Sequence, residues 1–240
     1  ECYPDLMWER DYNGNTPLHT AAKLWDAYNL FNSHFEVQWE KACRNYHDSP
    51  TEEGLLIIPP WRVKNSQGNT PCHEAANNRQ YPVPGFRTLH TFDPEATTYV
   101  NRTGDTSLHI YAQNGIWVDS NFVIDMRDRE GLTPLLRAAK CGNSQMVHNM
   151  LTNFPQLIQV QDDRGRSLLH HLRVIEERTQ KSAKELYNKF PTMDGLRKTK
   201  DFDGNTPLHW TIQDGNPMAA KLIAERFVEA DGERMASQQL

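Results

Sequence analysis

GNTPCHEAA at residues 68–76 decides the fold, because the same pattern returns five more times along the chain. The other copies are GNTPLHTAA at 14–22, GDTSLHIYA at 104–112, GLTPLLRAA at 131–139, the weaker GRSLLHHL at 165–172 and GNTPLHWTI at 204–212. Their first glycines are separated by 54, 36, 27, 34 and 39 residues. A unit of this size cannot bury its apolar face alone, so neighbouring units must stack on one another.

Each position of the motif has a physical reason. The glycine can adopt the positive φ that turns an extended loop into a helix. The residue two places later, such as Thr70, can accept a hydrogen bond from a first-turn amide, and a proline next to it, such as Pro71, loses no helical hydrogen bond. Thr-Pro pairs therefore predict helix starts at 16–17, 70–71, 133–134 and 206–207. The leucines and alanine pairs that follow are expected in the core.

Second helices are clearest in two of the copies. Asn143 and Ser144 are expected to cap a helix with an apolar stripe formed by Met146, Val147, Met150, Leu151 and Phe154. Pro217 is expected at the start of another helix, with a stripe formed by Met218, Leu222, Ile223 and Phe227. Each stripe should pack against a neighbouring unit.

The central copies depart from the regular pattern. GLLIIPPW at 54–61 belongs to an insertion between the first two motifs. Pro82 and Pro84 exclude a helix before about Gly85, and residues 116–128 leave little room for a second helix. Because each unit contacts only its neighbours, we expect local opening near residues 80–130 and two less coupled halves.

The motif and its spacing resemble the ankyrin repeat. The resulting fold class is all-α: an ankyrin-repeat solenoid of about six helix-turn-helix repeats with short β-hairpin fingers, irregular in repeats 1–3. We expect a single domain over residues 1–240. Its approximate repeats are 11–64, 65–100, 101–127, 128–161, 162–200 and 201–230.

Composition narrows the classes of function. The 240-residue chain has a formal charge of −5 and a pI near 6.1, so it lacks the global basic field that nucleic-acid binding needs. Its four cysteines, at positions 2, 43, 72 and 141, have no disulfide or zinc spacing and indicate reduced thiols in a cytoplasmic setting. The longest apolar run, residues 55–60, is far shorter than the roughly 20 residues of a membrane span.

The positions of the histidines indicate a structural role rather than a catalytic one. Five of them share one motif position: His19, His73, His109, His170 and His209. Because they are distributed one per copy, hydrogen bonding to a helix start or an adjacent finger is favoured over metal binding. Leu136 takes this place in the fourth copy. No nucleophile, paired acid and base or phosphate loop occurs at meaningful spacing, so we expect no enzyme activity, metal or cofactor.

Residues 162–200 differ in charge from the rest of the chain. They hold ten Lys or Arg and six Asp or Glu, a local charge of +4. A solvated helix face with paired charges is the favoured interpretation. The alternative is an acidic partner or an anionic membrane surface.

The repeat architecture predicts where a protein partner binds. Finger tips and the exposed edges of first helices line the concave side of such a stack. The predicted binding residues are Tyr12, Asn13, Lys23, Gln67, Asn69, Arg102, Asp105, Arg129, Glu130, Arg164, Arg166, Phe202 and Gln213. Lys140 and Arg173 hold equivalent helix edges. The aromatic rings of Tyr12 and Phe202 are interface anchors or stack on neighbouring fingers.

Four longer stretches resemble one group of ankyrin proteins. They are IPPWRVKNSQGNTPCHEA at 58–75, DPEATTYVNRTGDTSLHIYAQNG at 93–115, FPQLIQVQDDRGRSLLHHL at 154–172 and KTKDFDGNTPLHWTIQDGN at 198–216. They look like the plant ankyrin-transmembrane proteins, whose repeats precede a membrane domain with a Pro-Gly-Gly signature. The resemblance covers about residues 4–228, and the signature itself is not among these residues. We expect both ends of the chain to be incomplete.

This resemblance implies a role as well as a fold. It implies a cytosolic interaction domain tethered to a membrane, acting in plant defence, programmed cell death or stress signalling, with no catalytic residues. One alternative is the cytosolic gating domain of a membrane channel. Another is a soluble pathogen effector that binds host proteins.

Overall fold

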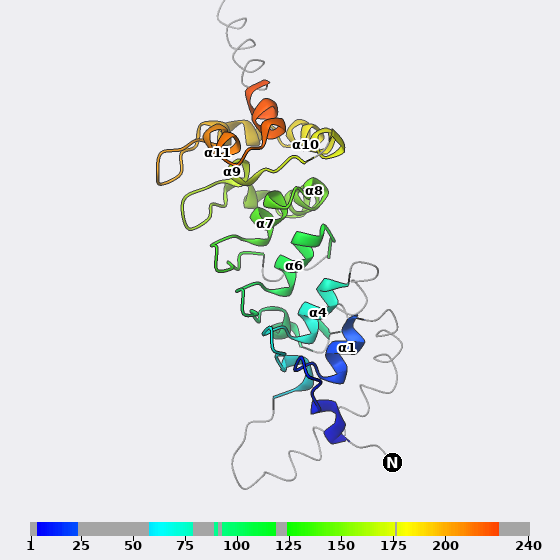
Figure 1. Ribbon diagram of the computed structural model, residues 1–240. Coiled ribbons are helices and arrows are strands. Elements are labelled where there is room, and N and C mark those ends of the chain that lie inside the picture. The colour runs from blue at the N-terminus through cyan, green and yellow to red at the C-terminus, as the bar shows by residue number, and fades with distance from the viewer. Residues whose placement is uncertain are drawn as a thin grey trace, which may run out of the picture. The chain divides into compact units, whose positions relative to one another are not determined.

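The computed structural model describes residues 4–23, 58–78, 89–90, 93–118, 124–175 and 177–225 (Figure 1). They belong to two compact units, one formed from residues 1–111 and 118–123, the other from 112–117 and 124–240. Every regular element within the described ranges is a helix. The expectations for Pro82, Pro84 and Phe227 lie outside these ranges, and the repeat boundaries stay predictions.

Short α-helices that each follow a finger, together with short 3-10 helices, make up the described part of the first unit. A finger is the five-residue loop that ends just before the motif Thr or Ser, here 11–15, 65–69 and 101–105. The elements are η1 (Pro4–Trp8), α1 (Pro17–Lys23), η3 (Pro60–Arg62), α4 (Pro71–Asn77), η4 (Pro94–Thr97) and α6 (Ser107–Asn114), whose last residues belong to the second unit. Helix α1 packs on α4, and a buried apolar cluster includes Leu18, Ala22, Trp61, Cys72 and Ala75.

Two rows of helices build the second unit (Figure 1). The first helices follow the fingers 128–132, 162–166 and 201–205; they are α7 (Pro134–Lys140), α9 (Leu168–His171) and α11 (Pro207–Gln213). The second row contains α8 (Ser144–Asn153), α10 (Glu177–Lys189) and a helix at 217–225, with η5 (Pro155–Gln159) and η6 (Pro191–Lys198) between them. Helix α9 packs against α7 and α11, and α8 packs against α7 and α10.

The helix starts lie where the Thr-Pro pairs predict them. Helices α1, α4, α7 and α11 each begin at the proline. The preceding glycine has the expected left-handed backbone, with φ of 77° at Gly68 and 76° at Gly165. The degraded fifth copy also forms a helix, α9, but it is only four residues long.

The fingers are tight loops rather than the β-hairpins expected from the sequence. Each is closed by two backbone hydrogen bonds, as between Asn65 N–H and Asn69 C=O (2.9 Å) and between Gly68 N–H and Asn65 C=O (2.9 Å). The described residues form no strand, and a single isolated bridge joins Gln161 to Ser167. A five-residue loop leaves too few paired residues for a regular ladder.

The second helix α8 buries four of the five residues of the predicted stripe: Met146, Val147, Met150 and Leu151. The fifth, Phe154, follows the last residue of the helix and is half-buried. A residue expected to cap this helix, Asn143, has another role. The Asn143 side chain does not cap α8; its Nδ2 donates to Ala112 C=O and Gln113 C=O, both at 2.8 Å. These carbonyls lie near the end of α6, where a helix leaves acceptors without intrahelical partners.

Candidate partner-binding surface

One side chain at the base of every finger organises the loop above it. The first finger residue is Asp or Asn in all six fingers: Asp11, Asn65, Asn101, Asp128, Asp162 and Asp201. In each, Oδ1 accepts hydrogen bonds from the backbone N–H groups two and four residues further on. The side chain thus accepts hydrogen bonds from finger N–H groups that the two backbone hydrogen bonds of the loop do not use. The finger tips are therefore held in a defined shape.

The same side chain is joined to the first helix nine residues later in four repeats. The pairs are Asn65 with Glu74, Asp128 with Arg137, Asp162 with His171, and Asp201 with Trp210. Their contacts are 2.9, 2.5, 2.9 and 2.5 Å long. We call this contact the finger clasp. In these four repeats the clasp holds the finger against the first helix that follows it. The helix residue of each clasp, such as Trp210, therefore faces the finger.

The motif histidines hold neighbouring fingers together, as predicted. In the first unit, His73 Nδ1 accepts from Thr70 N–H at 3.1 Å and contacts the Thr70 hydroxyl at 2.8 Å. Its Nε2 lies 2.9 Å from the carbonyl of Asp105, in the next finger. His19 and His170 make the same contact, to Asn69 and Asn205. Because a carbonyl only accepts, Nε2 carries the proton, and burial lowers the pKa of His73 to about 4.

The first unit uses several of its predicted binding residues internally. Lys23 pairs with Glu74 at 3.0 Å, although the lysine remains exposed. Asn69 is only 4% exposed, and its Nδ2 donates to Gln67 Oε1 and to Glu74 Oε1. We therefore leave Asn69 out of the surface offered to a partner. Tyr12 is fully exposed.

The other predicted residues lie mostly at the surface of their own unit. Those that are exposed are Asn13, Gln67 and Arg102 in the first unit and Arg129, Glu130, Arg164, Phe202 and Gln213 in the second. Asp105 and Arg166 are half-buried. Phe202 lies against the preceding finger, since a Cβ at Gly165 would be 2.7 Å from its ring carbons, yet the side chain is 79% exposed. Phe202 therefore stacks on the neighbouring finger, one of the two alternatives, and its role as an interface anchor stays a prediction.

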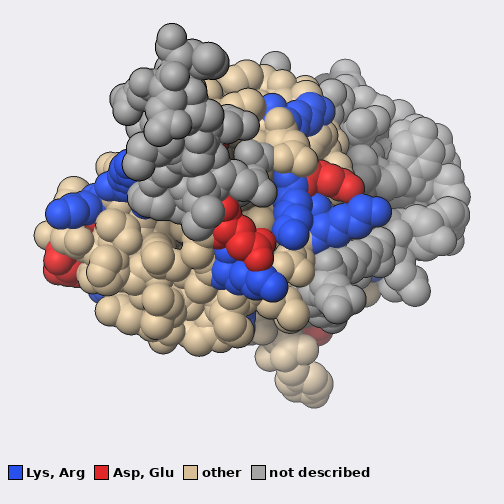
Figure 2. All heavy atoms as spheres, turned by 90° about the horizontal axis from the view of Figure 1, so that it is seen from above, with Lys and Arg blue, Asp and Glu red and all other residues tan. Residues whose placement is uncertain are grey.

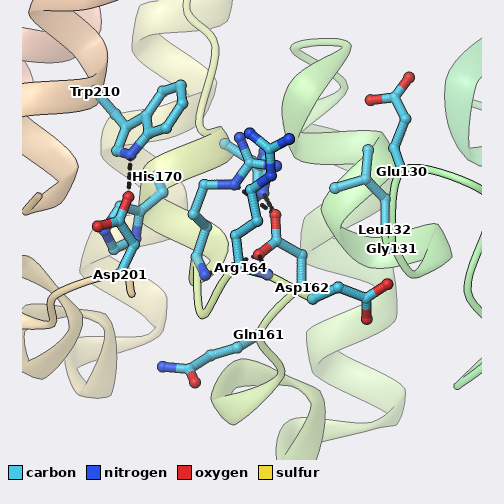
Figure 3. Close-up of polar contacts among 12 residues, drawn as sticks. Glu130, Gly131, Leu132, Gln161, Asp162, Arg164, His170, Asp201 and Trp210 are labelled. Atoms are coloured by element: carbon cyan, nitrogen blue, oxygen red, sulfur yellow. Dashed lines mark hydrogen bonds and ion pairs between the residues drawn. The ribbon is translucent and has the colours of Figure 1, made fainter. Parts of the chain in front are cut away.

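A hollow of about 210 Å³ opens on the second unit between α9, α11 and the end of α7. Lys140, Arg166, Arg173 and Trp210 are among its walls. The guanidinium carbon of Arg166 lies 4.8 Å from the centre of the Trp210 ring, a cation–π contact. Figure 3 shows Trp210 pointing at Asp201, to which its Nε1 donates at 2.5 Å.

A buried carboxylate supports the floor of this hollow. Asp162 Oδ2 accepts from Arg166 Nε at 2.6 Å and from His171 Nε2 at 2.9 Å. Burial opposes ionisation of Asp162, but the hydrogen bonds from His171 and from two backbone amides outweigh it and lower its pKa. Burial also lowers the pKa of His171, so this ring is neutral near pH 7 and donates through Nε2. The carboxylate charge is therefore balanced by Arg166.

The sequence predicts a surface position for some residues that line this hollow, but it does not predict the hollow itself. The helix edges Lys140 and Arg173 and the finger residue Arg166 were expected at the surface, whereas His171, Trp210 and Asp214 were not. The signal that could have found His171 and Trp210 is the Asp or Asn nine residues earlier, at the base of the finger. That signal is weak without coordinates, because His171 and Trp210 have little in common chemically.

The part of the chain that the structure describes contains neither a cluster of metal ligands nor a helix that could span a membrane. There, no group of three or more His, Cys, Asp or Glu side chains is arranged to hold a metal ion. Among the same residues, no helix has the length and apolar character needed to cross a membrane. Cys72 and Cys141 are free thiols, and burial raises the pKa of Cys72 to about 12.

Comparison with known proteins bears on the fold. No protein-family model matches the chain. NF-kappa-B inhibitor delta of Mus musculus is 27% identical over 177 residues, which cover 67% of this chain and 50% of that protein. The crystal structure of EF0377, an ankyrin repeat protein, matches with a TM-score of 0.53 at 19% identity, over 85% of this chain and 97% of its own.

The chain has the ankyrin-repeat fold. A protein-interaction module of the ankyrin type is the coarse function that these two likenesses support. The chain spans about half the length of the curated relative that it matches.

Proposed function

We propose that this chain is the partner-binding ankyrin domain of a membrane-tethered regulator of plant immune, cell-death or stress signalling. The partner is held by the fingers and first helices, which we call the inner face. The observation that carries the partner-binding part of this proposal is the hollow of the second unit, where a floor of clasped side chains supports exposed cationic groups. A preorganised surface of this kind loses little entropy when a partner binds.

The comparison with NF-kappa-B inhibitor delta supports a role through binding. The name of that protein describes inhibition of another protein. An ankyrin domain that has no catalytic groups, as the sequence predicts for this chain, can inhibit or regulate by occupying a surface of its partner. We therefore propose that this chain also acts by capture of a protein, in the cytoplasm.

The membrane tether and the plant role rest on the resemblance of the stretches 58–75, 93–115, 154–172 and 198–216 to the plant ankyrin-transmembrane proteins. The tether itself would lie outside these residues. Fractionation of the full-length protein from leaf tissue tests it. We expect the full-length protein to stay in the membrane pellet after a carbonate wash and residues 1–240 alone to remain in the supernatant. A full-length protein that washes off would exclude the tether.

Capture of partners by the immobilised chain tests the inner face. The double variant Arg164→Ala/Arg173→Ala removes two positive charges from the inner face of the second unit. The matched control Lys181→Ala/Lys184→Ala removes two positive charges from α10, in the second row of helices. All four side chains are exposed.

We expect the inner-face variant to retain at least about tenfold less partner from leaf extract than the unsubstituted chain, and the control to differ by less than about twofold. Circular dichroism should show the same helical content in all three chains. Equal capture by the inner-face variant would mean that partners bind elsewhere on the molecule.

A further inference from the structure

Three cationic side chains and one carboxylate line the hollow of the second unit. The cations are Lys140, Arg166 and Arg173, and the carboxylate is that of Asp214. Its volume of about 210 Å³ is below the roughly 300–1,000 Å³ of pockets that enclose small-molecule ligands. A space of this size suits one or two side chains of an extended peptide.

The three cations differ in how far their charge is already used. Lys140 forms an ion pair with Glu130, in the finger that precedes α7, so its charge is balanced. Arg166 donates Nε to Asp162, which leaves its two terminal nitrogens without a recorded hydrogen bond among the described residues. Arg173 is exposed, and no ion pair of its side chain is recorded there either. Arg166 and Arg173 therefore offer donors that the fold does not use.

The orientation of Arg166 is fixed before any ligand binds. Asp162 holds one edge of the guanidinium, and the Trp210 ring lies against it at 4.8 Å. Trp210 is itself held by Asp201, and the Arg173 backbone is held by a 3.1 Å hydrogen bond from its N–H to Ala139 C=O. A planar guanidinium with free terminal nitrogens matches the two oxygens of a carboxylate.

We propose that this hollow binds an acidic segment of the protein partner, with a Glu or Asp carboxylate between Arg166 and Arg173. The proposal rests on the proposed function, because it assumes that the inner face of the second unit holds a protein. The unused guanidinium donors of Arg166 and Arg173 carry the choice of occupant, because they match the acceptor oxygens of a carboxylate. Trp210 supplies an apolar wall for the methylene groups of a glutamate side chain.

An extended polyanion such as a nucleic acid or an anionic bilayer fits the surface less well. Asp214 lies at the same hollow, and the chain as a whole carries a charge of −5. Figure 2 shows Lys and Arg side chains next to Asp and Glu side chains on the face seen there, not one continuous positive area. A short acidic side chain can reach the two arginines without crossing neighbouring carboxylates.

Fluorescence anisotropy with a fluorescein-labelled hexaglutamate peptide tests the proposal. Hexaglutamine is the uncharged probe of equal length. We expect hexaglutamate to bind the full 240-residue chain at least about tenfold more tightly than hexaglutamine at low salt. Equal binding of the two peptides would overturn the proposal.

Matched charge reversals locate the site. Arg173→Glu should weaken hexaglutamate binding by at least about tenfold, and Lys184→Glu, with the same charge change on α10, by less than about twofold. Equal losses would show general attraction to the whole chain and would overturn the proposal. Arg166→Lys keeps the charge but loses the planar fork, and a loss of about fivefold or more is expected. Circular dichroism and thermal melts control for folding of each variant.

Further outcomes distinguish an acidic peptide from an anionic lipid surface. They also distinguish failure of the acidic-peptide inference from failure of the proposed inner face. Binding to phosphatidylserine vesicles that Arg173→Glu abolishes, without binding of hexaglutamate, would overturn the acidic-peptide proposal in favour of a lipid surface. If the inner-face variant loses its partners while hexaglutamate does not bind, only the acidic-peptide inference fails. If that variant keeps its partners and the peptide does not bind, the proposed inner face fails too.

Discussion

The segments 65–77 of the first unit and 128–140 of the second follow the same backbone path with different side chains. Thr70 has φ −86° and ψ 168°, and Thr133 has φ −82° and ψ 164°. Both precede a proline that begins a seven-residue helix. The first segment holds His73 at the motif position, and the second holds the fully buried Leu136. The loop and helix start therefore form with or without the histidine.

The loss of the histidine leaves a visible trace. In the first segment the Thr70 hydroxyl lies 2.8 Å from His73 Nδ1. In the second, the Thr133 hydroxyl is buried and has no hydrogen-bond partner among the described residues. Leu136 adds buried apolar area, but its side chain can neither accept a hydrogen bond from the threonine hydroxyl nor donate one to the next finger. Apolar packing and hydrogen bonding are thus alternative ways to fill one position.

The finger clasps differ in the same two segments. Asn65 meets Glu74 through an amide, and Glu74 also accepts from Asn69 and pairs with Lys23. Asp128 meets Arg137 as an ion pair, with the carboxylate fully buried. The first clasp spreads one charge over several partners, whereas the second relies on one cation. We expect the second to be more sensitive to substitution.

The largest effect is expected from Arg137→Leu. It would leave the buried Asp128 carboxylate without its cation and should lower the free energy of unfolding by about 3–5 kcal/mol in urea denaturation at pH 7. The comparison is Glu74→Gln, which keeps an acceptor for the amides of Asn65 and Asn69 and should cost about 1 kcal/mol. Equal costs would contradict the difference drawn between the clasps.

A smaller loss is expected from His73→Leu, which copies the second segment into the first. The Thr70 amide, its hydroxyl and the Asp105 carbonyl would lose a partner, at a cost of about 2–3 kcal/mol by urea denaturation at pH 7. Leu136→Met conserves volume at the equivalent position and should cost less than about 1.5 kcal/mol. A cost below about 0.5 kcal/mol for His73→Leu would mean that the histidine bonds add nothing to stability.

The same substitution should change the pH dependence. The pKa of His73 is lowered to about 4 by burial, from its ordinary value of 6.5. Between these values the unfolded chain binds a proton that the folded chain does not, so the free energy of unfolding falls as pH falls from 6.5 toward 4. For one histidine the slope approaches about 1.4 kcal/mol per pH unit.

Urea denaturation between pH 6.5 and 5 measures this slope while most carboxyl groups remain ionised. The parent chain should lose stability on acidification, and His73→Leu should lose about 1 kcal/mol less per pH unit than the parent. His19, His170 and His171, whose pKa values are also lowered by burial, act in the same direction in both chains. Parallel slopes would show that His73 titrates normally.

The smallest effects come from the two threonines, and here a difference in sign is expected. Thr70→Val removes a hydroxyl that contacts His73 and should destabilise by about 1 kcal/mol. Thr133→Val removes a buried hydroxyl without a recorded partner and should be neutral or slightly stabilising. Thermal melts of both variants under one condition provide the test. Destabilisation of equal size at both positions would refute the claim that the threonine hydroxyl adds to stability only where a histidine is present to pair with it.

The sequence by itself determined the repeat, its helix starts and the hydrogen-bonding role of the motif histidines. These follow from local rules: a glycine with positive φ at 68, a proline at 71 and a histidine three residues after its threonine act within one short segment. The apolar stripe of α8 is equally local, since helical periodicity defines it. The membrane tether and the plant role stay predictions, because they concern residues and partners beyond this chain.

Tertiary structure decided the clasps and the hollow. Asp162 and His171 are nine residues apart, and the finger must fold back over its helix before they meet. Arg166 and Trp210 are 44 residues apart in sequence and touch only because α9 packs on α11. Tertiary packing also moved the Asn143 side chain from its own helix start to the end of α6. A local pattern can specify a loop or a helix, but contacts between loops and helices depend on how they pack.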